Sequence, residues 1–364
     1  MSVRRIVLVD WLGRGGIAHC SEAWVEVLRR EGADVLLATR PGRELATSVA
    51  PAISVGVGIP GALGAHLTLI ARIIREVARV RPDVVILQNF VVPHVEVALV
   101  VAAQRAGAEV VLVAHEPALS RAAPGGARAL RHLFRRVDRL VVHSAFVGDL
   151  VGEASGRSDI ACIPLPLPVG LLARRGVDVS VLPVRDGLLA LHVGNLHRSY
   201  KGTDMLVDVV GAPLPPWSFG LVGRGAPPTA GATSVDRFLT PAELVATVEL
   251  SHAVLLPYRS ASQSGVVVLA QALGAVVLAT RVGGLAEQVE DGVDGLLLGI
   301  DAPASAWREQ LSALADAGYR AQLAGSALRR VTEDHVRFAT EVRHLALGKP
   351  SASSSGQATS PFAP

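Results

Sequence analysis

Short runs of β-branched and other apolar residues alternate with helix-length segments along nearly the whole chain. This alternation is typical of α/β proteins, in which helices connect the parallel strands of a sheet. In the first half we expect strands at residues 6–9, 34–38, 84–87, 110–113 and 140–142. Segments 20–31 and 67–79 have the length and pattern of helices between them. The first half therefore predicts one Rossmann-like domain.

The pattern lapses after residue 163, where Pro164, Pro166 and Pro168 alternate with leucines and an Arg-rich stretch follows. Proline at alternate positions continues neither a helix nor a central strand. Strands are again expected at 189–193, 219–222, 253–257 and 276–279, and only helices from about residue 304. We therefore predict an N-terminal domain over 1–165, a linker over 166–187, a C-terminal domain with closing helices over 188–347 and a disordered tail over 348–364.

Composition limits the classes of function that need consideration. Half of the residues are hydrophobic, but the longest stretch without a formal charge, 45–71, is broken by Pro51 and Pro60. Such a stretch does not predict a membrane-spanning helix, and no signal peptide is evident, so a cytoplasmic protein is expected. The two cysteines, Cys20 and Cys162, have no neighbours at metal-ligand spacing, and ordinary thiols are expected. The net charge of +3 is small and does not indicate nucleic acid as a partner.

A glycine-rich turn follows the first predicted strand. Gly13, Gly15 and Gly16 allow a tight turn that leaves the N-terminus of the next helix open to an anion or a sugar ring, and His19 follows them. The alternative is a simple strand-to-helix turn, but the histidine after the glycines favours function. A second glycine cluster, 56–61, fits the dinucleotide pattern G-x-G-x-x-G, but it contains proline and opens no helix, so we reject it.

Further polar residues follow later strands of the first half. His115 comes directly after the strand at 110–113, where it could bond a substrate hydroxyl or be satisfied by neighbouring backbone. His143 and Ser144 end the next strand in the same way and are weaker candidates. An Arg-rich helix over 128–139 could face anionic lipid or an acidic partner, although such a run is more often a solvated helix face.

The second half carries a cationic loop and a Ser-rich turn. Arg198 and Lys201 lie between a predicted strand and a helix, and Lys201 is one of only two lysines in the chain. Together they suit a diphosphate, Arg through its fork and Lys as a point charge. Segment 260–266 places serines before a helix, where they are expected to cap it and where free N–H groups form an anion site. The sequence contains no Asp-x-Asp, no P-loop and no G-x-S-x-G motif, which leaves a divalent metal, a cofactor and a serine nucleophile without support.

Together these motifs resemble the family-four retaining glycosyltransferases of the GT-B fold, over nearly the full chain to about residue 345. The resemblance rests on segments 15–19, 200–202 and 223–225, on His115, and above all on the long stretch from 256 to 287. It implies two facing Rossmann-like domains, an N-terminal one on the acceptor side and a C-terminal one for the nucleotide-sugar donor. The C-terminal helices should pack back toward the N-terminal domain.

The resemblance also implies roles for individual residues. Arg198 and Lys201 would hold the donor diphosphate and, with His115, form the catalytic set, while His19 and His115 would lie on the acceptor side. The other donor-binding positions would be Gly15, Gly16, Gly223, Ser262, Gln263, Ser264, Gly265, Val266 and Gln271. The leaving phosphate itself would take the acceptor's proton, so cations and amides aimed at it would supply most of the catalysis.

One departure from the family concerns two carboxylates. The family commonly has glutamates at the positions of Gln263 and Gln271. Glutamine still bonds sugar hydroxyls but carries no charge. Three functions therefore stay open: a glycosyltransferase, which we favour, a non-catalytic protein that binds a nucleotide-sugar or a partner enzyme, and, more weakly, a sugar epimerase. The acceptor could be a glycan, a lipid or a small metabolite, and peripheral contact with a membrane is one possible arrangement. The Arg-dominated composition suggests a bacterial source.

Overall fold

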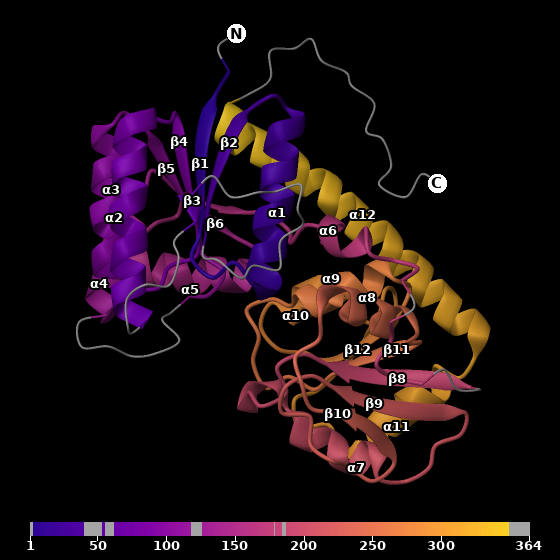
Figure 1. Ribbon diagram of the computed structural model, residues 1–364. Helices are drawn as coiled ribbons and strands as arrows, with labels where there is room; N and C mark the ends of the chain where they lie inside the picture. Colours follow the sequence, from indigo (N-terminus) through magenta and orange to yellow (C-terminus); the bar gives the residue numbers. More distant parts are fainter. Residues whose placement is uncertain are drawn as a thin grey trace. The chain divides into compact units, whose positions relative to one another are not determined.

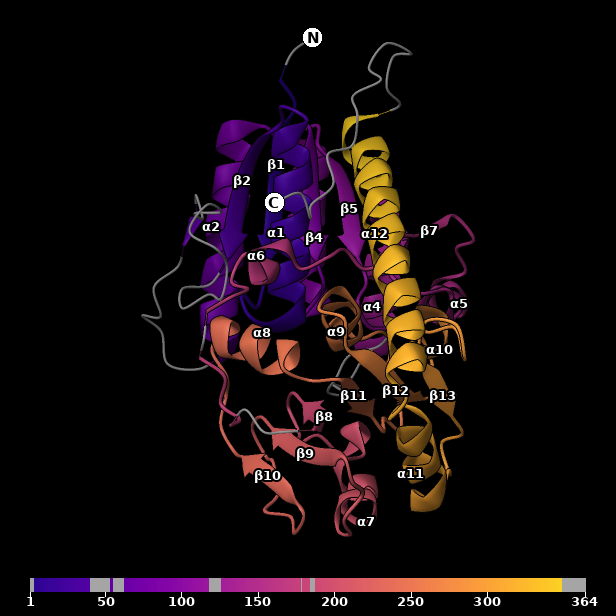
Figure 2. The same ribbon diagram turned by 90° about the vertical axis from the view of Figure 1, so that its right-hand side faces the viewer.

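The computed structural model describes residues 3–39, 53–54, 62–117, 126–177, 179–183 and 187–348 (Figures 1 and 2). The chain forms two compact units. The first unit comprises Met1–Val142, Val151–Pro166 and Glu333–Pro364, and the second His143–Leu150 and Leu167–Thr332. The rejected glycine cluster at 56–61 and the tail from 349 lie outside the described residues, as do residues 178 and 184–186 of the predicted linker.

The first unit is built on a seven-stranded parallel sheet with the strand order β3-β2-β1-β4-β5-β6-β7. Its strands are β1 (Arg5–Asp10), β2 (Asp34–Thr39), β3 (Ile53–Ser54), β4 (Val84–Gln88), β5 (Glu109–Val113), β6 (Arg139–Val142) and β7 (Ile160–Cys162). The five strands expected from the sequence all form. The edge strands β3 and β7 were not predicted, because runs of two or three residues carry no periodic signal.

Helices cover both faces of this sheet (Figure 1). One face, which includes Ile6 and Leu8, packs against α1 (Gly15–Arg30) and the last turns of α12 (Ala317–Leu347). There Trp24 meets Phe338 edge to face, with ring centroids 5.8 Å apart. The C-terminal helix thus packs onto the N-terminal domain, as expected. The other helices of this unit are α2 (Ala62–Val80), α3 (Pro93–Arg105) and α4 (Gly126–Arg136), whereas α5 (Ala145–Ser155) begins in the second unit and ends in the first.

The second unit contains a six-stranded parallel sheet with the order β10-β9-β8-β11-β12-β13. Its strands are β8 (Leu188–Val193), β9 (Trp217–Val222), β10 (Ala232–Val235), β11 (Ala253–Leu256), β12 (Val276–Thr280) and β13 (Leu296–Leu298). Its helices are α6 (Val169–Leu172), η2 (Ser199–Lys201), η3 (Thr203–Leu206), α7 (Val207–Val210), α8 (Pro241–Glu249), α9 (Gly265–Ala272), α10 (Leu285–Gln288) and α11 (Ala304–Ala313).

Alternate strand residues of this sheet feed two separate cores. Leu191 and Val254 belong to the core that contains residues of α8 and α9, whereas their neighbours Ala190 and Leu255 belong to the core around Trp307 of α11. A sheet that is apolar on both faces needs helices on both. The α/β class and the two Rossmann-like domains predicted from the sequence are therefore confirmed.

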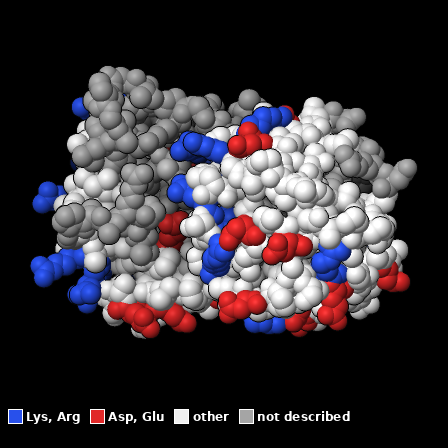
Figure 3. All heavy atoms as spheres, turned by 90° about the horizontal axis from the view of Figure 1, so that it is seen from below, with Lys and Arg blue, Asp and Glu red and all other residues white. Residues whose placement is uncertain are grey.

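Charged side chains do not gather into a single-sign field on the face drawn in Figure 3, where basic and acidic groups are interspersed. The Arg-rich helix α4 turns its apolar residues inward, and two of its arginines bond the end of α5. Arg131 Nε donates to the Ala154 carbonyl (3.0 Å) and Arg135 Nε to the Ser155 carbonyl (2.6 Å). Cations at a helix C-terminus are stabilising. None of the described helices is long and apolar enough to cross a membrane.

Candidate active site

The ammonium group of Lys201 lies over an aromatic ring. After β8 the chain turns at Gly194 and runs to η2, whose last residue is Lys201. The Nζ atom is 3.7 Å from the centroid of the Tyr258 ring and 5.4 Å from that of Tyr200. Within the described ranges, neither Lys201 nor Arg198 forms an ion pair with a carboxylate. The loop therefore presents positive charge that no acidic side chain of the described residues neutralises.

Residues directly after Tyr258 hold this loop in place. The Arg259 N–H donates to the Tyr200 carbonyl (2.7 Å), and the guanidinium donates to the Ser199 carbonyl (3.0 Å). The same guanidinium pairs with the Asp204 carboxylate at 2.5 and 2.8 Å, and these hydrogen bonds lower the pKa of the Asp204 carboxyl. The planar fork of Arg259 thus bonds residues on both sides of Lys201 and fixes the turn between them.

Gly202 permits the close approach of this turn to β11. Its φ is +61°, and an added Cβ would stand 1.8 Å from the Pro257 carbonyl oxygen. No side chain fits at that distance, and a positive φ strains other residues. The glycine after Lys201 is therefore required by packing.

His192, which the sequence reasoning missed, supports the loop from below. It is fully buried in β8, with Nδ1 2.8 Å from the Leu255 carbonyl oxygen and Nε2 3.0 Å from Thr203 Oγ1. Burial lowers the pKa of His192 to about 4, and the charge of Lys201 acts in the same direction. The ring is therefore neutral near pH 7, and Nδ1 donates to the Leu255 carbonyl. The Thr203 hydroxyl lies between Nε2 and the Leu196 carbonyl oxygen, which is 3.3 Å away. The one sequence signal was a polar residue inside an apolar strand.

A second glycine turn packs against the first at the neighbouring strand end. Gly223 has φ +127°, and an added Cβ would lie 1.9 Å from the Gly194 carbonyl oxygen. The His197 N–H donates to the Arg224 carbonyl (3.1 Å). The predicted donor residue Gly223 is thus brought beside the cationic loop, because β8 and β9 are adjacent and parallel.

The Ser-rich turn leads into α9, but the predicted serine cap is wrong. Ser264 occupies the cap position with extended backbone, yet its side chain makes no capping bond. Instead its N–H donates to Gln288 Oε1 (2.7 Å), and Gln288 Nε2 donates back to the Ser264 carbonyl (3.2 Å). Gly265 is exposed with open space around it. The first N–H groups of a helix have no partner within it, so this end of α9 suits an anion.

Gln288 also accepts a hydrogen bond from the buried side chain of Gln271, whose Nε2 donates to the Gln288 carbonyl (3.1 Å). Gln271 is 1% exposed, whereas Gln263 is half-buried. A contact between Gln271 and the donor stays a prediction. What the structure shows is an internal bond that a glutamate could not donate.

Two glycines after β12 support the Ser-rich turn. Added Cβ atoms at Gly283 and Gly284 would stand 2.1 Å from the Ala261 carbonyl oxygen and 1.9 Å from that of Ser262. Ser144, a weaker candidate in the sequence, donates through Oγ to the Ser262 carbonyl (3.0 Å).

Lys201, Gly223 and the start of α9 all lie at the carboxyl edge of the second sheet, where ligands bind in such folds.

In the first unit, Asp10 shapes the glycine-rich turn. Its Oδ1 accepts the N–H groups of Leu12 and Gly13, both at 2.9 Å, and burial raises the pKa of this carboxyl. Gly15 has φ +67°, and added Cβ atoms at Gly15 and Gly16 would meet nothing within 4 Å. Among the described residues, the space that a side chain would take at Gly15 and Gly16, at the start of α1, is therefore unfilled. Asp10 was not predicted from the sequence because it belongs to no recognised motif, although it is a charged residue at the end of an apolar strand.

The two histidines predicted for the acceptor side are both nearly buried. His19 Nδ1 lies 3.8 Å from Glu22 Oε2, and His115 Nε2 lies 3.1 Å from Gln88 Oε1. Asp10 and Gln88 are register partners at the ends of β1 and β4. The predicted groups of this unit therefore also meet at the carboxyl edge of its sheet. Of the two cysteines, Cys20 is buried and Cys162 is exposed.

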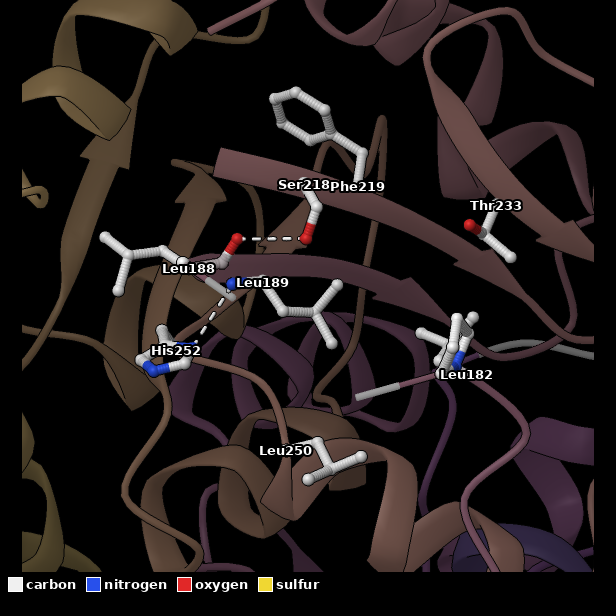
Figure 4. Close-up of a pocket in the computed structure, with 10 residues that line it drawn as sticks. Leu182, Leu188, Leu189, Ser218, Phe219, Thr233, Leu250 and His252 are labelled. Atoms are coloured by element: carbon white, nitrogen blue, oxygen red, sulfur yellow. Dashed lines mark hydrogen bonds between the residues drawn. The ribbon is translucent and has the colours of Figure 1, made fainter. Parts of the chain in front are cut away.

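A cavity of about 120 Å³ lies at the opposite, amino edge of the second sheet (Figure 4). Leu188 and Ser218, which lie at the starts of β8 and β9, line it with His252, whose Nδ1 accepts the Leu189 N–H at 3.2 Å. Ligand pockets for molecules of nucleotide size are roughly 300–1,000 Å³. This cavity is too small, and lies at the wrong end of the strands, to be the donor site.

Solved structures with similar folds include HepE of Anabaena in complex with UDP and glucose, with a TM-score of 0.72 and 17% identity over 94% of this chain and 98% of that chain. Sucrose-phosphate synthase from Thermosynechococcus elongatus has a TM-score of 0.69 and 17% identity, over 95% and 97% of the two chains. At this identity the likeness concerns the fold, and it defines a protein of the GT-B class.

Sequence matches give the family. Residues 187–317 match the family Glycosyl transferases group 1, and residues 14–170 match Glycosyltransferase Family 4. The chain is therefore a family-4-like member of the group 1 glycosyltransferases. A curated relative, the D-inositol 3-phosphate glycosyltransferase of Acidothermus cellulolyticus, is 30% identical over 177 residues, which cover 42% of this chain and 39% of that protein.

Proposed function

We propose that this chain is a retaining, metal-independent glycosyltransferase that takes a sugar from a nucleotide-diphosphate sugar. The observation that carries the proposal is the Lys201 ammonium, held without a carboxylate among the described residues at the same sheet edge as the open start of α9. A diphosphate carries about two negative charges, and it is bound best by cations and N–H groups that are already in position.

The proposed reaction uses charge at the leaving group. Arg198 and Lys201 offset the charge that develops on the departing nucleotide, while the N–H groups near Gly265 bond phosphate or sugar oxygens. The leaving phosphate accepts the proton of the acceptor hydroxyl, and the acceptor oxygen bonds to the sugar carbon that the phosphate leaves. His19 and His115 orient the acceptor and the sugar.

Two substrates are the first to test. Because HepE, which has a similar fold, was solved in complex with UDP and glucose, UDP-glucose is the first donor to test. Because the curated relative is named for D-inositol 3-phosphate, a polyol phosphate is the first acceptor, followed by glycans and lipids. The cytoplasm remains the expected location.

The test is incubation of the protein with UDP-, GDP- and dTDP-sugars, with and without acceptors, in the presence of a chelator. Nucleotide release that is lost in Lys201→Ala supports the proposal, and NMR of the product's anomeric carbon shows whether configuration is retained. Tight binding of a nucleotide-sugar without turnover on any acceptor would favour the non-catalytic alternative. Turnover that requires added metal would contradict the metal-independent mechanism.

A further inference from the structure

Lys201 is positioned by an aromatic ring where a carboxylate would be the commoner partner of a lysine. The Nζ atom lies over the Tyr258 ring, 3.7 Å from its centroid. We propose that Tyr258 is a positioning residue that fixes the Lys201 ammonium for the donor diphosphate through the face of its ring. This inference rests on the proposed function and adds to it the group through which Lys201 is held.

A ring suits this task for an electrostatic reason. The face of an aromatic ring is negative and attracts a cation without cancelling its net charge. A carboxylate in the same place would neutralise the ammonium and repel the phosphates. Lysine has a long flexible stem, so some partner must restrict it before the ligand arrives. The ring does this and leaves the full charge available.

The Tyr258 ring is rigid with respect to the loop that carries Lys201. Tyr258 is 1% exposed and belongs to the core of the second unit. Its carbonyl accepts the Thr280 hydroxyl, and the next residue, Arg259, bonds the backbone of Tyr200 and Ser199. Consecutive residues therefore hold the ring below the ammonium and the turn around it.

The hydroxyl group of Tyr258 does not explain why the ring is there. Its oxygen is buried and has no hydrogen-bond partner among the described residues. A buried hydroxyl without a partner costs free energy, so the useful part of the side chain is the ring. Tyr258→Phe should therefore keep the function, whereas Tyr258→Leu should lose it while retaining apolar bulk.

Tyr200 provides a matched control on the other side of the ammonium. Its ring centroid is 5.4 Å from Nζ, and the side chain is 42% exposed. Water weakens an exposed cation–ring contact. Tyr200→Leu should therefore change diphosphate affinity much less than Tyr258→Leu.

The experiment is a double-mutant cycle read by calorimetric titration with UDP and with inorganic pyrophosphate. Tyr258→Leu should weaken both affinities roughly two- to thirtyfold, since such contacts are worth about 0.5–2 kcal/mol and 1.4 kcal/mol is tenfold. In a Lys201→Ala background the same change should have no further effect. An equal loss in both backgrounds would overturn the inference. If Lys201→Ala itself leaves the affinities unchanged, the proposed donor role fails and the positioning role fails with it.

A second measurement avoids substitution altogether. The chain has two lysines, Lys201 and Lys349, so selective ¹³C labelling of lysine gives two sets of side-chain signals. The ring of Tyr258 should shift the ε-methylene protons of Lys201 upfield from those of Lys349, and pyrophosphate should move the Lys201 set alone. Coincident signals in the free protein would contradict an ammonium held over the ring.

Discussion

The Gln271 side chain donates to the backbone carbonyl of Gln288, 3.1 Å away, inside the second unit. Gln288 in turn exchanges two hydrogen bonds with the backbone of Ser264, at the start of α9. The buried Gln271 thereby holds Gln288 in place, and Gln288 holds the predicted phosphate-binding turn. A carboxylate at position 271 would face the carbonyl oxygen with no proton to donate.

We therefore expect Gln271→Glu to destabilise the protein. The variant loses a buried donor and gains a charge in a site that is 1% exposed, which costs on the order of 1–3 kcal/mol. Urea unfolding at pH 7.5 measures the change. Gln263→Glu is the matched control, because that side chain is half-buried and should move the unfolding midpoint less. If Gln271→Glu and the natural chain are equally stable, the hydrogen bond from the Gln271 side-chain amide does not contribute to stability.

Gly202→Ala should both destabilise the second unit and weaken diphosphate binding. The new Cβ would stand 1.8 Å from the Pro257 carbonyl oxygen at a φ of +61°, so the turn that carries Lys201 must move. We expect a loss of about 1–3 kcal/mol and weaker UDP affinity by titration. Gly299→Ala is the control, because an added Cβ there meets nothing within 4 Å. The expectation is wrong if the two variants behave alike.

Stability should decrease as the pH falls through the range in which His192 titrates in the unfolded chain. Its pKa is about 4 when folded, against an ordinary value of 6.5. Above pH 6.5 the group is neutral in both states. Between pH 6.5 and 4 the unfolded chain binds a proton that the folded chain does not, so unfolding becomes easier as the pH falls. The full effect is roughly 3 kcal/mol.

The measurement compares urea unfolding of the natural chain and His192→Gln from pH 7.5 to pH 4. The variant should be less stable at pH 7.5, because the two buried hydrogen bonds of the ring are lost, and its deficit should shrink as the pH falls. His132→Gln serves as the control, since His132 is exposed on α4. A deficit that stays constant with pH would contradict the low pKa.

Removing the Asp10 carboxylate should loosen the glycine-rich turn of the first unit. Asp10→Ala deletes the acceptor for the N–H groups of Leu12 and Gly13, which should cost about 1–3 kcal/mol. Asp10→Asn keeps an oxygen in place and should cost less. Amide hydrogen exchange gives a local readout, in which the Leu12 and Gly13 amides should exchange faster in the Ala variant than in the Asn variant. Unchanged exchange in both would exclude this role for Asp10.

The sequence by itself was sufficient for the architecture and for the position of the cationic loop. Buried parallel strands must be apolar over runs of several residues, and the helices between them have their own period, so both are readable from near neighbours. Lys201 could be singled out from the sequence because lysine is rare in this chain, and counting lysines needs no knowledge of which residues lie close in space. Short edge strands such as β3 and β7 escaped detection because they carry too few residues for a period.

Only the tertiary structure decided which groups hold the predicted site. Tyr258 lies beside Lys201, His192 beside Thr203, and Gln271 beside Gln288, and each pair comes from different elements of the chain. These contacts depend on strand order and register, which place the ends of strands together irrespective of their separation in sequence. Local pattern therefore identified the charged residue, whereas the aromatic ring, the neutral histidine and the buried amide that support the site emerged from packing.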